Sequence, residues 1–163
     1  MKIVKILFIL FGLLGKFVCG SDVADYKERL FSSARHDNDW WVSRAGGYLG
    51  LKSKLEPCKP YINSLDEHGE VALNYAIIQR CEMVAKWLIA NGANVNIVGR
   101  TSGLAPLHAA TIYSQPNIVW LLLRKGACPH AKDLDGFTVL DLVGLAEPSD
   151  DIAVIKSLLA RVK

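Results

Sequence analysis

The stretch from Arg100 to His130 reads RTSGLAPLHAATIYSQPNIVWLLLRKGACPH, and its order of helix-start and helix-stop signals decides the fold. Pro106 suits the first position of a helix, where its missing N–H is not needed. An apolar stripe predicts a second helix, and Gly126 then supplies a left-handed C-cap. The stripe consists of Ile118, Val119, Leu121, Leu122 and Leu123. The stretch therefore predicts a turn, a short helix, a tight corner and a longer helix.

The same arrangement occurs twice more in the chain. The other copies read DEHGEVALNYAIIQRCEMVAKWLIANGANVN from Asp66 and DLDGFTVLDLVGLAEPSDDIAVIKSLLA from Asp133. The turn glycines recur at intervals of 34 and 33 residues, at Gly69, Gly103 and Gly136. The helix-ending glycines recur at an interval of 34 residues, at Gly92 and Gly126. A fixed period of this length is typical of repeat proteins whose stacked units share one core.

The three copies resemble the ankyrin repeat. Its unit has an Asp-x-x-Gly turn, a Thr-Pro-Leu-His helix start, an Ala-Ala pair and a Val-Val-x-Leu-Leu-Leu helix ending in Gly-Ala. The copies span residues 66–99, 100–132 and 133–163, and are called the first, second and third units below. The resemblance implies an all-α ankyrin-repeat solenoid of stacked helix-turn-helix units with short β-turn or hairpin tips.

The units depart from the family pattern at a few positions. The Thr-Pro-Leu-His start becomes VALN at residues 71–74, APLH at residues 105–108 and TVLD at residues 138–141. Arg100 stands where the turn aspartate is expected, whereas Asp133 fits that role. The third unit carries about two extra residues around Glu147-Pro148-Ser149, which predict a protruding corner before a last helix that starts at Asp150-Asp151.

Residues 21–65 are interpreted as a degenerate N-terminal capping repeat. Terminal repeats of a solenoid are atypical because one side has no neighbour to bury against. Helices are predicted over residues 26–35 and 40–49, followed by a rigid loop over residues 57–60. Tyr61-Ile62-Asn63 is placed in register with Asn94-Val95-Asn96 of the first unit.

The first 20 residues have the pattern of a signal peptide. Lys2 and Lys5 precede an apolar run over residues 6–15, and Val18 and Gly20 are the small residues that a signal peptidase needs. We expect cleavage after Gly20 and an exported protein, either periplasmic or secreted. An uncleaved anchor is the alternative, although the run is short for a membrane span. A lipid anchor at Cys19 is disfavoured by the residues before it.

Charge limits the classes of partner. Cleavage would remove three lysines and leave 16 basic and 16 acidic residues. A neutral domain lacks the basic surface that binds phosphate backbones, so no nucleic acid is expected. We also expect no membrane contact after cleavage, and a monomer.

No group of residues supports catalysis or metal binding. His108 is interpreted as structural: in the family this histidine hydrogen-bonds to the turn, partly through a threonine hydroxyl, and Ala105 replaces that threonine here. Cys128 and His130 are only half of a zinc site, which commonly has two paired clusters. We therefore predict no catalytic residues, no metal and no cofactor, so the protein is not an enzyme. Cleavage would leave Cys58, Cys81 and Cys128, an odd number, so at least one cysteine is expected to be unpaired. A disulfide between Cys58 and Cys81 stays possible only if the N-terminal repeat is irregular.

Protein binding is the predicted function. The resemblance implies that turn residues and the last residues of each first helix face a concave groove. In the first unit these are Glu67, His68, Glu70, Ile78 and Gln79; in the second Thr101, Ser102, Leu104, Ile112 and Tyr113; in the third Leu134, Asp135, Phe137, Leu145 and Ala146. The predicted partner-binding residues are Ile78, Leu104, Ile112, Tyr113, Leu134 and Phe137, with Trp120 on a second surface.

Two biological roles fit these predictions. An exported immunity or escort protein would bind a partner in the periplasm or outside the cell, and a secreted effector would bind a host protein. A metal-binding or catalytic protein is the less favoured class.

Overall fold

The computed structural model describes residues 20–35 and 47–161 of the 163-residue chain. The predicted signal peptide therefore lies outside the described residues, apart from Gly20, which begins the first helix. The helices, in chain order, are α2 (Gly20–Arg35), α4 (Gly47–Leu55), the 3-10 helix η1 (Glu56–Tyr61), α5 (Ala72–Ile78), α6 (Glu82–Ala90), α7 (Pro106–Ile112), α8 (Pro116–Arg124), α9 (Val139–Leu145) and α10 (Asp150–Leu159).

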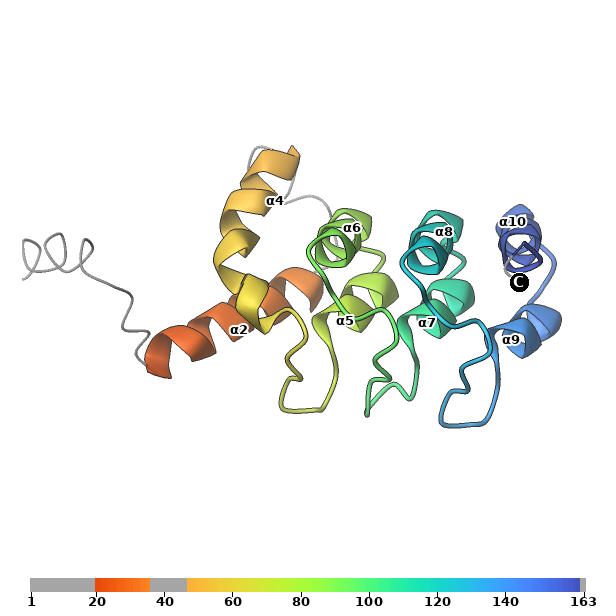
Figure 1. The fold of residues 1–163 in the computed structure, drawn as a ribbon, viewed down its shortest axis with the longest axis horizontal. Coiled ribbons are helices and arrows are strands. Elements are labelled where there is room, and N and C mark those ends of the chain that lie inside the picture. Colours follow the sequence, from red (N-terminus) through yellow and green to blue (C-terminus); the bar gives the residue numbers. More distant parts are fainter. Residues whose placement is uncertain (1–19, 36–46, 162–163) are drawn as a thin grey trace, which may run out of the picture.

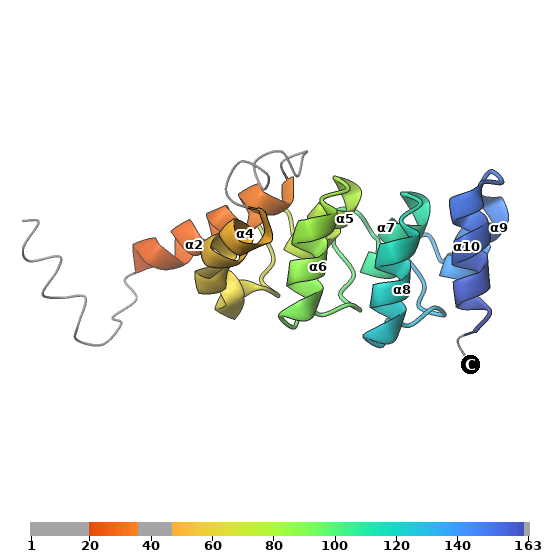
Figure 2. The ribbon, with the colours of Figure 1, turned by 90° about the horizontal axis from the view of Figure 1, so that it is seen from above.

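The helices form a two-layered stack of pairs (Figure 1). Each unit contributes one antiparallel pair, α5 with α6, α7 with α8 and α9 with α10, and each pair packs against the next. Seen from above, α6, α8 and α10 lie side by side in front of α5, α7 and α9 (Figure 2). Turn-containing loops project from one side of the stack and carry the isolated bridges between Leu65 and Val71 and between Lys132 and Thr138. The predicted all-α solenoid is confirmed.

The predicted caps of the second helices are confirmed. Gly92 and Gly126 have φ of 92° and 86°, the left-handed region that costs other residues steric strain. The N–H of Ala127 donates to the carbonyl of Leu122, which closes the end of α8. Pro106 is the first residue of α7, as its fixed φ predicts.

The N-terminal unit differs from its prediction. Its first helix, α2, packs against α5 and begins earlier than residue 26. Its second helix was expected over residues 40–49, but α4 runs to Leu55, and residues 36–46 lie outside the described part. The expected loop over residues 57–60 is the 3-10 helix η1. Leu55 and Cys58 are both fully buried, and helical spacing across α4 and η1 brings both into the core.

Asparagine side chains confirm the register of this unit. Asn63 donates from Nδ2 to the carbonyl of Gly92 and accepts the N–H of Asn94 at 2.7 Å. Asn96 repeats the pattern one unit later, with the carbonyl of Gly126 and the N–H of Cys128. These bonds link neighbouring units along one edge of the stack.

The buried carboxylate of Asp66 connects α2 to the first unit through hydrogen bonds. Arg35 donates to Asp66 at 2.6 Å and Tyr75 donates to the same oxygen at 2.9 Å. Burial raises the pKa of Asp66, but hydrogen bonds from the Glu70 N–H, Tyr75 and Arg35 outweigh it and leave the pKa below its ordinary value. The charged carboxylate is therefore part of the folded junction.

The core is continuous from α2 to α10 and includes Cys58 and Cys81. Cys58 carries a free thiol, so the disulfide with Cys81 is not formed. Burial raises the pKa of this thiol, which keeps it protonated. Of the helices described, none is both long and apolar enough to cross a membrane.

Candidate functional site

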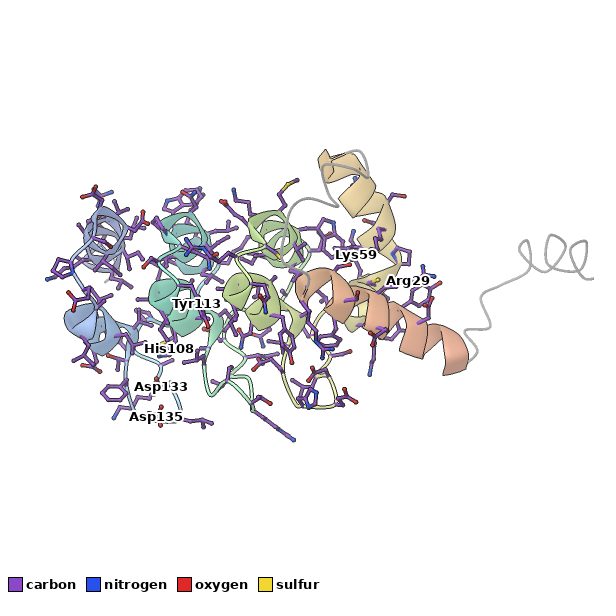
Figure 3. All side chains as sticks on the ribbon, turned by 180° about the vertical axis from the view of Figure 1, so that it is seen from behind. Arg29, Lys59, His108, Tyr113, Asp133 and Asp135 are labelled. Atoms are coloured by element: carbon purple, nitrogen blue, oxygen red, sulfur yellow. The ribbon has the colours of Figure 1, made fainter. Side chains whose placement is uncertain are left out.

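His108 joins the second unit to the third. Its Nε2 lies 3.1 Å from the carbonyl oxygen of Ala131 and 3.2 Å from that of Phe137, and the side chain is fully buried. Carbonyl oxygens only accept, so we assign the proton to Nε2. Nδ1 is buried without a hydrogen-bond partner among the described residues, because Ala105 offers no hydroxyl. Figure 3 shows His108 on α7 and Tyr113 at the C-cap of this helix. The histidine is therefore a structural tie.

Asn74 occupies the same register in the first unit and also reaches its neighbour. Its Nδ2 donates to the carbonyl of Leu104 at 2.9 Å and to Glu70 at 2.7 Å. Asp141, at this register in the third unit, instead caps its own helix by accepting from the N–H and hydroxyl of Thr138. This register therefore links the first unit to the second and the second unit to the third.

The groove prediction for Glu70 is wrong, because this side chain is buried between units. Its Oε1 accepts from the N–H of Val71, and its Oε2 accepts from the N–H of Ser102 in the second unit. Any Cβ on Gly99 would collide with the Glu70 carboxylate, so glycine is required at that position.

The missing turn aspartate explains why Glu70 is recruited. In the first and third units, Asp66 and Asp133 accept the N–H groups of their own turns. The second unit has Arg100 at this position, and Glu70 from the unit before supplies a carboxylate to its turn instead. The sequence signal for the contact between Glu70 and Ser102 was therefore Arg100, which replaces the turn aspartate and directly follows Gly99.

Exposed apolar side chains gather at the groove positions of the second and third units. Ile112 is 48% exposed, Phe137 42%, and Leu134 and Leu145 each 72%. We call these four residues the distal groove surface. Leu134 and Phe137 belong to the last projecting loop, the loop that carries Asp133 and Asp135 in Figure 3. Leu145 was mapped to the groove but not selected as a partner-binding residue.

Three of the other predicted partner-binding residues are less exposed to a partner than the distal groove surface. Ile78, Leu104 and Tyr113 are half-buried, and Ile78 and Leu104 pack against the core. Trp120 is 46% exposed on α8, where the Arg124 guanidinium lies 4.9 Å from the centre of its ring. Its exposure is compatible with a second contact surface, and that role stays a prediction.

The groove positions of the first unit are more polar. Glu67 and His68 are exposed at its turn, and their side chains lie 3.4 Å apart. The groove therefore changes from polar at the first unit to apolar at the third. This gradient follows directly from the sequence once the register is known.

A hollow of about 450 Å³ lies beside the distal groove surface. It is formed between the ends of α7 and α9 and the corner that leads to α10. The extra residues Glu147 and Ser149 are part of its wall. Sequence reasoning predicted the protruding corner but not the hollow, because the hollow also needs the neighbouring unit.

Cys128 and His130 do not assemble a metal site. The N–H of Cys128 is bonded to Asn96 as part of the asparagine series. Within residues 20–35 and 47–161, no group of three or more His, Cys, Asp or Glu side chains is placed to hold a metal ion.

Known proteins share this repeat pattern. A family model described as ankyrin repeats (3 copies) matches residues 42–133. The chain is 34% identical over 137 residues, 84% of its length, to the E3 ubiquitin-protein ligase hecd-1 of Caenorhabditis elegans. It is 33% identical over 86 residues, 52% of its length, to the human inhibitor of Bruton tyrosine kinase. It is 48% identical over 48 residues, 28% of its length, to the ankyrin repeat protein OPG025 of Monkeypox virus.

These relatives are much longer proteins. The chain spans 5%, 6% and 8% of their respective lengths. What they share with it is the repeat array, a fold that generally mediates protein–protein interactions and is typically not catalytic. Both the family match, which covers more than half of the chain, and the stacked helix pairs lead to one assignment. The chain belongs to the ankyrin-repeat family.

Proposed function

We propose that the protein binds a protein partner through the distal groove surface. The observation that carries the proposal is the exposure of Ile112, Leu134, Phe137 and Leu145. Contiguous exposed apolar side chains on a folded protein commonly mark an interaction site, and large apolar and aromatic anchors contribute most to binding. The more polar turn of the first unit makes the site directional, because a partner gains apolar contacts only toward the third unit.

The groove offers a rigid platform for such a partner. The two loops that border it are held by His108 and Glu70, whose hydrogen bonds cross between units. A preorganised surface loses little conformational entropy on binding. The surface therefore needs no rearrangement to present its apolar side chains.

Affinity capture tests the proposal. The full chain is immobilised and exposed to a native extract of the producing organism, with chemical cross-linking and mass spectrometry as the readout. Phe137→Asp and Ile112→Asp are expected to lose the partner while remaining folded, because water already reaches nearly half of each residue's surface. Val154→Asp is the matched control, since Val154 is exposed to a similar degree on α10, away from the groove.

The outcome can contradict the proposal directly. If every protein captured by the wild type is also captured by Phe137→Asp and Ile112→Asp, the distal groove surface is not the binding site. Trp120→Asp is included as well, because loss of the partner in that variant alone would move the site to the outer surface of α8.

We also propose that the protein acts outside the cytoplasm. The support is the sequence pattern of residues 1–20, and the partner would then be an exported protein that it neutralises or escorts. A secreted effector that binds a host protein is the alternative, supported by the same pattern. Fractionation of the producing cells, with mass measurement of the isolated protein, is expected to find the chain outside the cytoplasm and beginning at Ser21. A cytoplasmic chain that retains Met1 to Gly20 would contradict export.

A further inference from the structure

The longer corner of the third unit forms the wall of an apolar hollow. The side chains of Ile112, Leu142, Leu145, Ala146 and Ile152 line the hollow of about 450 Å³ described above. Its volume falls within the range of roughly 300–1,000 Å³ that is usual for ligand pockets. Three helices and the corner contribute to the lining, so the hollow exists only where the second and third units meet.

Negative charge without an ion-pair partner among the described residues lies in the wall of this hollow and in the residues that follow it. Glu147 lies in its wall, and Asp150 and Asp151 begin α10 directly after it. All three are exposed, and within the described part of the chain none forms an ion pair or a side-chain hydrogen bond. A carboxylate at a helix N-terminus is stabilised by the helix dipole, which accounts for Asp150 and Asp151 but not for Glu147.

A smaller hollow of about 220 Å³ continues along the same edge of the stack. Ser114 lines both hollows, and Asp151 lines the smaller one. The corners that form them lie along one edge in Figure 2. Arg80 is the one basic residue among the lining residues of the two hollows, and Glu82 beside it is bonded to Lys86. Negative charge therefore predominates at the end nearest the third unit.

We propose that the hollow receives an aliphatic side chain from a segment of the partner protein that carries lysine or arginine on either side of it. The apolar lining selects a side chain such as leucine, isoleucine or methionine by excluding water from it. Glu147 in its wall, with Asp150 and Asp151 at the start of α10, selects the flanking charge, because opposite charges across an interface accelerate and orient binding. This proposal rests on the proposed function, since Ile112 and Leu145 belong to both surfaces.

A random peptide library provides the test. Phage-displayed peptides of 12 residues are selected on the full chain and counter-selected on Leu145→Asp, a substitution at a largely exposed position that leaves the fold intact. The expected result is enrichment of peptides with an aliphatic residue flanked by Lys or Arg. Enrichment without a basic preference, or with an acidic one, would overturn the charge part of the proposal. The absence of any peptide that depends on Leu145 would overturn the hollow as a site.

Binding of the enriched peptide, measured by fluorescence anisotropy, sharpens the result. The triple variant Glu147→Gln, Asp150→Asn, Asp151→Asn keeps the size of each side chain and is expected to weaken binding about tenfold at low salt, the sum of three weak surface charge interactions. The wild-type affinity should fall with added salt and that of the triple variant should not. Equal affinities would contradict the charge part of the proposal.

The two proposals can fail separately. Capture of the native partner depends on Phe137, which does not line the hollow, whereas peptide selection depends on Leu145, which does. If the peptide test fails but Phe137→Asp still loses the native partner, the proposed function stands. Only the proposal that the hollow is a binding site is then contradicted. Failure of the capture test, with no partner lost in Phe137→Asp, removes the proposed function.

Discussion

The second and third units share their register and a leucine at the equivalent position of the first helix, but within the described stack the second unit has a neighbour on both sides and the third on one side. Leu107 of α7 is 1% exposed, whereas Leu140 of α9 is 46% exposed. Position 108 holds a buried histidine that reaches the next unit, and position 141 holds an exposed aspartate that caps its own helix. The shared leucine is therefore buried where a further unit packs against it and exposed at the end of the described stack, while the next position differs in residue type as well as in structural role.

The second helices of these two units also differ in burial, with the helix of the third unit more exposed to water. Leu122, the seventh residue after the N-cap of α8, is fully buried, and Lys156 takes that place in α10 and is exposed. The outer side of α10 is therefore suited to water, as in a capping repeat. The first helix and the turn-containing loop of the third unit, in contrast, carry exposed apolar side chains. This part of the third unit is therefore open to a partner.

Alanine at the shared leucine position is expected to show the largest difference. Leu107→Ala should lower the free energy of unfolding by about 3 kcal/mol, because it leaves a cavity between units. Leu140→Ala should change it by less than about 1 kcal/mol, because water already reaches that side chain. Urea denaturation followed by circular dichroism measures both. Equal losses would mean that another element covers Leu140 in solution.

Substitution at the next position tests the tie between units. His108→Ala is expected to cost about 2 kcal/mol, because the carbonyl groups of Ala131 and Phe137 lose the donor that the buried histidine supplies. His108→Asn is the matched control and should retain part of the stability, since Asn74 reaches the next turn from the same register. Asp141→Ala should have a smaller effect than His108→Ala. Denaturation curves compare the three variants, and a neutral His108→Ala would contradict the structural role.

Adding the missing hydroxyl should stabilise the second unit. Ala105→Thr places an N-cap on α7 and a donor near the orphaned Nδ1 of His108, so we expect a gain of about 1 kcal/mol. Thr138 already caps α9 in this way. Ala105→Val has the shape of threonine without the hydroxyl and should give little or none of the gain. The difference in melting temperature between Ala105→Thr and Ala105→Val reports the contribution of the hydroxyl group to stability. Equal melting temperatures would argue against the cap.

The capping carboxylate of the third unit should titrate at low pH. Hydrogen bonds from the Thr138 hydroxyl and N–H lower the pKa of Asp141. Because this pKa is lower in the folded state than in the unfolded state, the cap stabilises fully above the unfolded value of about 3.9 and its contribution is lost as pH falls through the folded value. Nuclear magnetic resonance titration of the carboxyl should show a raised pKa in Thr138→Val. An unchanged pKa in that variant would mean that the hydroxyl does not hold the carboxylate.

Predictions from the sequence succeeded where the signal was local. Pro106 begins α7, Gly126 ends α8 and Asp150 begins α10, each as expected from the chemistry of that residue. The loop predicted over residues 57–60 was wrong because Pro57 and Pro60 suggested an irregular backbone, although a 3-10 helix accommodates both. Glu70 was misplaced for a different reason, since its partner Ser102 lies in another unit.

The sequence by itself determined the period, the helix starts and ends, and the change from a polar to an apolar groove, because each follows from neighbouring residues and one repeat length. Tertiary structure alone decided that Leu140 is exposed whereas the equivalent Leu73 and Leu107 are buried, that Glu70 is buried, and that the longer corner forms a hollow against Ile112. Burial depends on what packs against a side chain. In a stack of repeats that neighbour is a whole unit away along the chain.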